Sequence, residues 1–165
     1  MLNRLDDMAV TSEFPSSEQR RAWLAVLAHA PRALLAAHAE AIAAESFEWL
    51  REPEIGLAML RGRVGNTGDR FNLGETTVTR CVVRHRGADG VATAGVGYVT
   101  GRDTERATWV ARFDALLQHP QRHATLMRDV VAPLCEATRV TRAAEAARTA
   151  ASRVRFYTLT PETRA

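Results

Sequence analysis

The sequence contains no lysine, and all 22 of its basic residues are arginines. This absence excludes enzymes that form a Schiff base on one of their own lysines. It also excludes a Walker A phosphate-binding loop, which requires a lysine. The arginines stay charged at any useful pH and suit forked contacts to carboxylates and phosphates, but the abundance of alanine is equally consistent with a simple GC-rich coding bias.

Cysteine is scarce, and long apolar runs are missing. The two cysteines, Cys81 and Cys135, are too few for a zinc framework and fewer than a small secreted protein usually carries. No stretch approaches the roughly 18 apolar residues of a membrane-spanning helix. The N-terminus carries Asp6, Asp7 and Glu13 and lacks the apolar core of a signal peptide. We therefore expect a cytoplasmic protein that does not bind membranes.

The usual catalytic and metal-binding motifs are also absent. No serine lies in a Gly-x-Ser-x-Gly elbow. Gly95 and Gly97 fall inside a predicted strand, which argues against a dinucleotide-binding loop. His119 and His123 have the spacing of a helical metal pair, but Pro120 lies between them and should turn their side chains apart. We expect no metal site, no bound cofactor and no self-sufficient catalytic set in this chain.

The length of 165 residues, with 46% hydrophobic and 25% charged residues, is typical of one globular domain. Ser16 to Glu18 offer a helix N-cap followed by an acidic first turn. Apolar spacing predicts two short helices within about 17–44, a helix capped by Asp103 that runs to about residue 118, and an alanine-rich helix over about 135–153. His119 and Pro120 should end the helix that Asp103 caps. Pro133 should interrupt a further helix that precedes the alanine-rich one.

The middle of the chain changes to alternating and β-branched residues, which predict strands. The predicted strands cover residues 54–64, 75–86, 91–100 and 154–159. Gly95 and Gly97 mark a place where another backbone or a partner approaches closely. We therefore predict a single α+β domain with an antiparallel sheet of about four strands, flanked by N-terminal helices and a C-terminal helical segment. Residues 1–15 are expected to be a flexible leader, 16–160 the domain and 161–165 a tail.

Segment 65–74 is dense in glycine and other turn residues. Such a loop can present backbone N–H groups as a concave anion-binding nest, and nearby arginines can grip phosphate oxygens. The candidate residues for contact with phosphate, substrate or a partner are Arg63, Gly65, Thr67, Gly68, Arg70, Arg80 and Arg102. The alternative is a structural hairpin connection whose arginines pair with Glu54, Asp69 or Glu75.

The C-terminal helix combines arginines with a stripe of alanines, which suits close helix packing. Glu136 and Glu145 interrupt its positive charge, and it carries no aromatic residues for base stacking. The formal net charge of +3 is only a mild bias. We therefore expect no nucleic acid as a partner.

Three stretches, taken in order and spacing, resemble the PhnG family of the bacterial carbon–phosphorus lyase system. They read RVGNTGDRFNLGETTVTR at 63–80, GYVTGRD at 97–103 and ASRVRFYT at 151–158. Residues 23–28 are similar to the opening helix of the family, so the resemblance covers about 17–160. One departure follows the Gly-Arg-Asp: the family often continues Lys-x-His-Ala-Glu, whereas residues 104–108 read TERAT. If those positions meet a partner subunit, the contact differs in this protein.

The resemblance implies a role in the use of phosphonates as a phosphorus source. Members of the family form a cytoplasmic core complex with PhnH, PhnI and PhnJ subunits. The complex displaces adenine from ATP with a phosphonate, and methylphosphonate gives α-D-ribose 1-methylphosphonate 5-triphosphate. The nucleosidase-like chemistry is attributed to PhnI, so this chain is expected to support a catalytic partner within a transferase, with ATP as the substrate of the complex. We expect the isolated chain to be inactive and to self-associate. The alternatives are a stand-alone anion- or nucleic-acid-binding module and an independent hydrolase.

Overall fold

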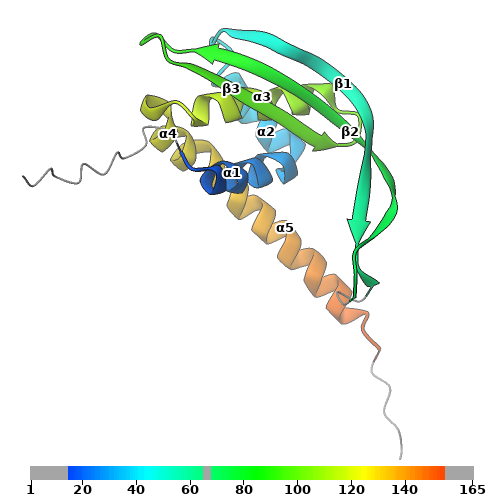
Figure 1. Cartoon of the computed structure of the whole chain (residues 1–165). Coiled ribbons are helices and arrows are strands. Elements are labelled where there is room, and N and C mark those ends of the chain that lie inside the picture. The colour runs from blue at the N-terminus through cyan, green and yellow to red at the C-terminus, as the bar shows by residue number, and fades with distance from the viewer. Residues whose placement is uncertain (1–14, 65–67, 155–165) are drawn as a thin grey trace, which may run out of the picture.

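The computed structural model describes residues 15–64 and 68–154. Over these residues the fold is α+β, as predicted, with the helices on one side of a curved antiparallel sheet (Figure 1). The sheet has three strands within the described residues, in the order β1-β2-β3, and not about four. The expected fourth strand at 154–159 lies outside the described residues apart from Val154, which belongs to no strand. The expected leader and tail also fall outside them, except for Pro15.

Two helices open the described chain, α1 (Ser17–His29) and α2 (Arg32–Glu40), as predicted. A reciprocal capping box begins α1. The backbone N–H of Gln19 donates to Ser16 Oγ at 3.2 Å, and the backbone N–H of Ser16 donates to Gln19 Oε1 at 2.8 Å. Trp23 and Leu27 of α1 are buried in the core.

The strands are β1 (Phe47–Gly62), β2 (Phe71–Arg86) and β3 (Ala92–Thr100). The first strand begins earlier than predicted, because Phe47 pairs with His85 although its local sequence does not alternate cleanly. The second strand also begins earlier, because Phe71 pairs with Gly62. The predicted loop over 65–74 is therefore wrong for residues 71–74, which belong to β2. Within the predicted loop, residues 68–70 are described and belong to no strand.

Helix α3 (Thr104–Leu117) packs against β2 and β3 and contributes most to the core. It begins at the predicted cap, where the backbone N–H of Arg106 donates to Asp103 Oδ1 at 3.0 Å. Gly95 and Gly97 of β3 allow the close approach that the sequence predicts. A Cβ atom added at Gly95 would lie 1.9 Å from Ala111 O, and one added at Gly97 would lie 2.0 Å from Ala107 O. The approaching backbone is that of α3.

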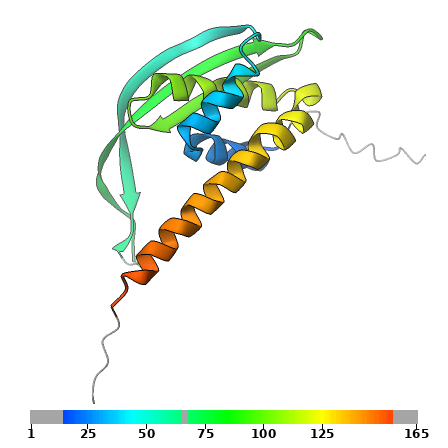
Figure 2. The same cartoon turned by 180° about the vertical axis from the view of Figure 1, so that it is seen from behind.

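The chain continues through α4 (Pro120–Leu126), the π-helical turn η2 (Met127–Val131) and α5 (Ala132–Ala151). Pro120 begins α4, so the predicted break after α3 is confirmed. The chain stays helical through Pro133, so the predicted break is wrong, but the helix is irregular there: the π-helical turn η2 ends at Val131, directly before the turn that holds Pro133. From residue 139 to its end, α5 is exposed on every side and projects from the body (Figure 2). The alanine stripe on this part of α5 therefore packs against none of the described residues.

Candidate functional site

The sheet narrows to two strands at one end and forms a projecting hairpin. We call residues 57–62 of β1 and 71–77 of β2 the hairpin arm. Strand β3 ends opposite Val78, so the strands of the arm pair only with each other (Figure 1). The arm extends beyond the end of β3 toward the C-terminal end of α5 in both views (Figures 1 and 2), and most of its residues are exposed.

The hairpin arm carries large apolar side chains that the protein does not bury. Ile55, at the base of the arm, is opposite Thr79, and Leu57 and Met59 follow it at alternate positions. Alternation places these three side chains on the same face as the buried Thr79 and Cys81. Their relative exposures are 51%, 65% and 51%. The core-facing side of the sheet therefore continues, uncovered, beyond the last helix that packs on it. An exposed patch of this kind marks an interaction surface.

The structure does not gather the predicted contact residues into one anion site. Gly65 and Thr67 lie outside the described residues, whereas Gly68 lies beside the tip of the arm with a positive φ of 73°. Arg63 and Arg70 flank the same tip and are exposed. The remaining two are elsewhere: Arg80 lies about 30 Å further along β2 at roughly 3.3 Å per residue, and Arg102 follows the end of β3.

Arg80 already has a carboxylate partner within the chain, which it shares with another arginine. Its Nε donates to Glu54 Oε1, and Arg51 Nη2 lies 2.8 Å from the same oxygen. The hydrogen bond from Arg80 is the main reason that the pKa of Glu54 lies below its usual range. Arg80 therefore makes the pairing with Glu54 that the structural alternative predicts.

The two histidines with metal-pair spacing point to different partners. His119 Nε2 lies 3.1 Å from Asp89 Oδ1, and His123 Nδ1 lies 2.7 Å from Leu117 O. The His123 ring also contacts the edge of Trp23, with ring centroids 5.5 Å apart. Within residues 15–64 and 68–154, no cluster of three or more potential ligand side chains is arranged to hold a metal ion.

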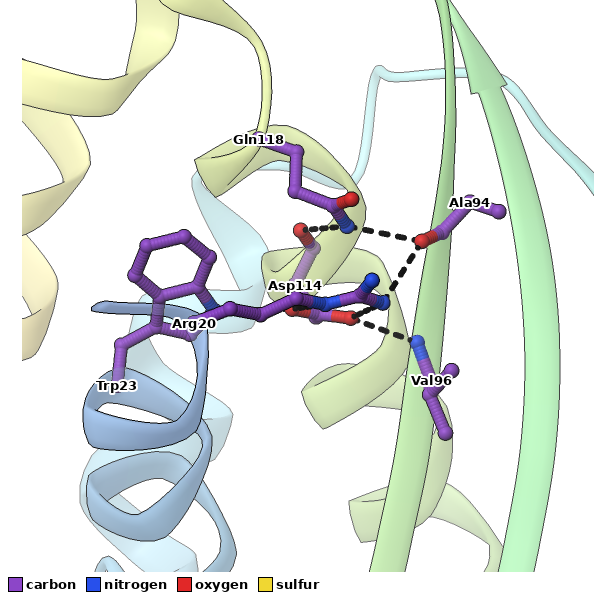
Figure 3. A network of polar contacts seen from close by, with 6 residues as sticks. All are labelled: Arg20, Trp23, Ala94, Val96, Asp114 and Gln118. Atoms are coloured by element: carbon purple, nitrogen blue, oxygen red, sulfur yellow. Dashed lines mark hydrogen bonds and ion pairs between the residues drawn. The ribbon is translucent and has the colours of Figure 1, made fainter. Parts of the chain in front are cut away.

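A buried carboxylate that the sequence analysis missed joins three elements of the fold. Asp114 of α3 is fully buried and accepts four hydrogen bonds (Figure 3). Arg20 Nε and Nη2 donate at 3.2 and 2.6 Å, Trp23 Nε1 at 2.9 Å and the backbone N–H of Val96 at 2.9 Å. This arrangement ties α1 and β3 to α3. Its role is structural, because every acceptor position is occupied by the protein itself.

The same network protects the free edge of β3. Ala94 O accepts hydrogen bonds from Arg20 Nη2 at 3.0 Å and from Gln118 Nε2 at 2.8 Å. These side chains occupy backbone groups that another strand would otherwise pair with, so this part of the edge is blocked.

Residues 104–108, where the sequence departs from the family pattern, form the start of α3. Arg106 Nη2 donates to Ala28 O at 2.7 Å and to Ala30 O at 2.9 Å. Arg106 therefore holds the corner between α1 and α2 against α3, so this arginine makes contacts within the chain.

None of the helices in the described parts of the chain has both the length and the apolar character needed to cross a bilayer.

Comparison with known proteins identifies the family. The family model described as "Phosphonate metabolism protein PhnG" matches residues 18–161. A protein of Rhizobium meliloti (strain 1021), named alpha-D-ribose 1-methylphosphonate 5-triphosphate synthase subunit PhnG, is 38% identical over 156 residues, which cover 93% of this chain and 96% of the relative. Both matches extend over nearly the whole chain, including the hairpin arm and α5. The chain therefore belongs to the PhnG family of phosphonate metabolism proteins.

Proposed function

We propose that this chain is the PhnG-type subunit of an α-D-ribose 1-methylphosphonate 5-triphosphate synthase in phosphonate catabolism. The complex would displace adenine from ATP with a phosphonate. The name of the relative supports this activity. The observation that carries the subunit role is the hairpin arm, whose apolar side chains are left exposed on an otherwise buried face. We expect no turnover of ATP and methylphosphonate by the isolated chain, and such turnover would contradict the proposal.

The proposed role is to scaffold a catalytic partner in a cytoplasmic complex with PhnH-, PhnI- and PhnJ-type subunits. The exposed half of α5 supports this role, because a helix of about 12–15 residues without packing is only marginally stable in water. Charge supports it as well. Several exposed arginines have no carboxylate within ion-pair distance among the described residues. They include Arg61 of the arm, Arg63 and Arg70 beside its tip, and Arg148 of α5. A partner surface with an apolar centre and acidic surroundings would complement both features.

The first test disrupts the apolar face of the arm. Leu57→Asp should reduce the recovery of the assembled complex at least tenfold, because an exposed anchor becomes a charge that must be desolvated on docking. The free energy of unfolding of the isolated chain should change by less than about 0.5 kcal/mol, because Leu57 is already 65% exposed. Recovery is measured by co-purification with co-expressed partner subunits, and stability by urea denaturation.

Leu34→Asp is the matched control for this variant. Leu34 is an exposed leucine of α2, outside the arm, and its replacement should leave assembly unchanged. Normal assembly of Leu57→Asp, or equal loss in both variants, would remove the arm as the docking surface.

We also propose that cations at the tip of the arm contact the substrate or a partner in the complex. Arg70 is exposed, and no carboxylate of the described residues pairs with it, whereas Arg80 already pairs with Glu54. In the reconstituted complex, Arg70→Ala should therefore raise the KM for ATP or lower kcat by about tenfold, the effect expected for one lost charge-assisted contact. Arg80→Ala should change both by less than twofold. If Arg70→Ala kept normal kinetics and assembly, the tip would be a structural connection.

A further inference from the structure

Two hollows meet along the first half of α5. The first has a volume of about 450 Å³ and lies between α5 and the corner that joins α1 to α2. The second has a volume of about 360 Å³ and lies between α5 and α1. His29, Thr138 and Arg142 line both, so the two hollows adjoin each other, and we call them together the groove. Its size is in the range of small-ligand sites.

The first hollow is the cationic half of the groove. Arg106 and Arg142 line it, and no carboxylate of the described residues lies within ion-pair distance of either side chain. The two backbone carbonyls at the end of α1 fix the guanidinium of Arg106. Arg32 also lines this half, but its guanidinium is already engaged by the carboxylates of Asp103 and Glu105. Arg106 and Arg142 are therefore the cations available to a ligand.

An acidic residue of α5 lowers this charge but leaves both arginines without an ion-pair partner among the described residues. Glu145 lines the same hollow, yet it forms no ion pair with any described arginine. Arg142 lies one helical turn away and stays exposed. A ligand anion can therefore approach Arg142 without breaking an existing salt bridge, which keeps the cost of binding low.

The second hollow is the apolar half. Ala25 and Val26 of α1 and Cys135 of α5 line it. The Thr138 hydroxyl, at the junction of the two halves, donates to Leu134 O at 2.8 Å, so its hydrogen is already engaged. A wholly polar ion would leave these apolar side chains unused, whereas a ligand with an apolar body would bury them.

We infer that this groove binds an organic oxyanion: a phosphonate, phosphate or carboxylate group on a small apolar body, with the oxyanion at Arg106 and Arg142 and the body against Val26 and Cys135. Arginine provides forked donors that match such headgroups. The inference goes beyond the proposed function and concerns this chain alone, so it stands or falls without the partner subunits.

Calorimetric titration of the purified full chain tests the inference with three probes. Phenylphosphonate should bind saturably and at least tenfold more tightly than methylphosphonate, which lacks the ring that fills the apolar half. Benzoate distinguishes the headgroups. Tighter binding of phenylphosphonate assigns a phosphonate-type site and tighter binding of benzoate a carboxylate site, and either result supports the groove. Absence of saturable binding of both aromatic probes at millimolar concentration would overturn the inference.

Two variants locate the binding. Arg142→Ala should weaken binding of phenylphosphonate about tenfold, because it removes a charge-assisted contact from an exposed position that the fold does not need. Arg148→Ala changes the same residue type further along the exposed part of α5, outside the groove, and should alter affinity by less than twofold. Equal affinity of Arg142→Ala and the unaltered chain would overturn the assignment.

The thiol of Cys135 provides a second readout that does not depend on a mutation. Cys135 is exposed, whereas Cys81 is buried and burial raises the pKa of its thiol to about 11. At pH 8 a thiol reagent should therefore modify Cys135 alone. Saturating phenylphosphonate should slow that modification at least fivefold. An unchanged rate would show that the probe does not occupy the groove.

Discussion

Replacement of Asp114 by alanine should lower the free energy of unfolding of the isolated chain by about 3–5 kcal/mol, which is the range expected when one partner of a buried ion pair is removed. The change leaves the indole N–H of Trp23 and the backbone N–H of Val96 without acceptors, and Trp23 is only 1% exposed. Arg20 can still reach water, because its side chain is 33% exposed. Urea denaturation followed by circular dichroism measures the loss.

Two further variants make this prediction specific. Asp114→Asn keeps the size of the side chain, but its amide has one accepting oxygen where four donors converge, so it should still lose about 2 kcal/mol or more. Asp129→Ala removes an exposed carboxylate that pairs only with its neighbour Arg128, and should leave stability nearly unchanged. If Asp114→Ala lost less than about 1 kcal/mol, the network would not hold α1 and β3 to α3.

Local signals in the sequence predicted the starts and ends of helices well. Ser16, Asp103 and Pro120 each act within a few residues of their own position, so their effects can be read without knowledge of the rest of the fold. Pro133 does not break the helix because the preceding turn is π-helical, and a change of helix type of this kind cannot be read from the local sequence.

Features set by distant contacts were predicted less well. Phe71 belongs to β2 because Gly62 of the facing strand offers it a pairing partner, which local composition does not show. The burial of Asp114 has no local signal in the sequence other than its apolar neighbours Phe113 and Ala115. The candidate contact residues were close in sequence, but an extended strand separates Arg80 from the tip of the arm. The resemblance of three sequence stretches to a family identified the protein correctly, whereas the spacing of the candidate contact residues did not predict a shared site.

The contact between β3 and α3 gives the second large effect. Gly97→Ala should lower the free energy of unfolding by about 3 kcal/mol or more, because the new Cβ would lie 2.0 Å from Ala107 O and 3.0 Å from Cys81 Sγ. Ala107 O is a backbone atom of α3, so α3 itself must shift away from the sheet. Gly95→Ala should cost a similar amount, because its Cβ would meet both Ala111 O and Ala115 N.

Gly56→Ala is the matched control on the same sheet. A Cβ at Gly56 of β1 meets no atom within 4 Å, and its φ is not in the left-handed region. The substitution should be neutral or should stabilise the chain by up to about 1 kcal/mol, because alanine reduces the freedom of the unfolded state. If Gly97→Ala and Gly56→Ala had equal stabilities, the loss could not come from the contact with α3. If only Gly97→Ala and Gly95→Ala unfold at lower urea concentration, the glycines of β3 are required because they let the backbone of α3 lie directly on the strand. The same packing places Asp114 within hydrogen-bond distance of the Val96 N–H.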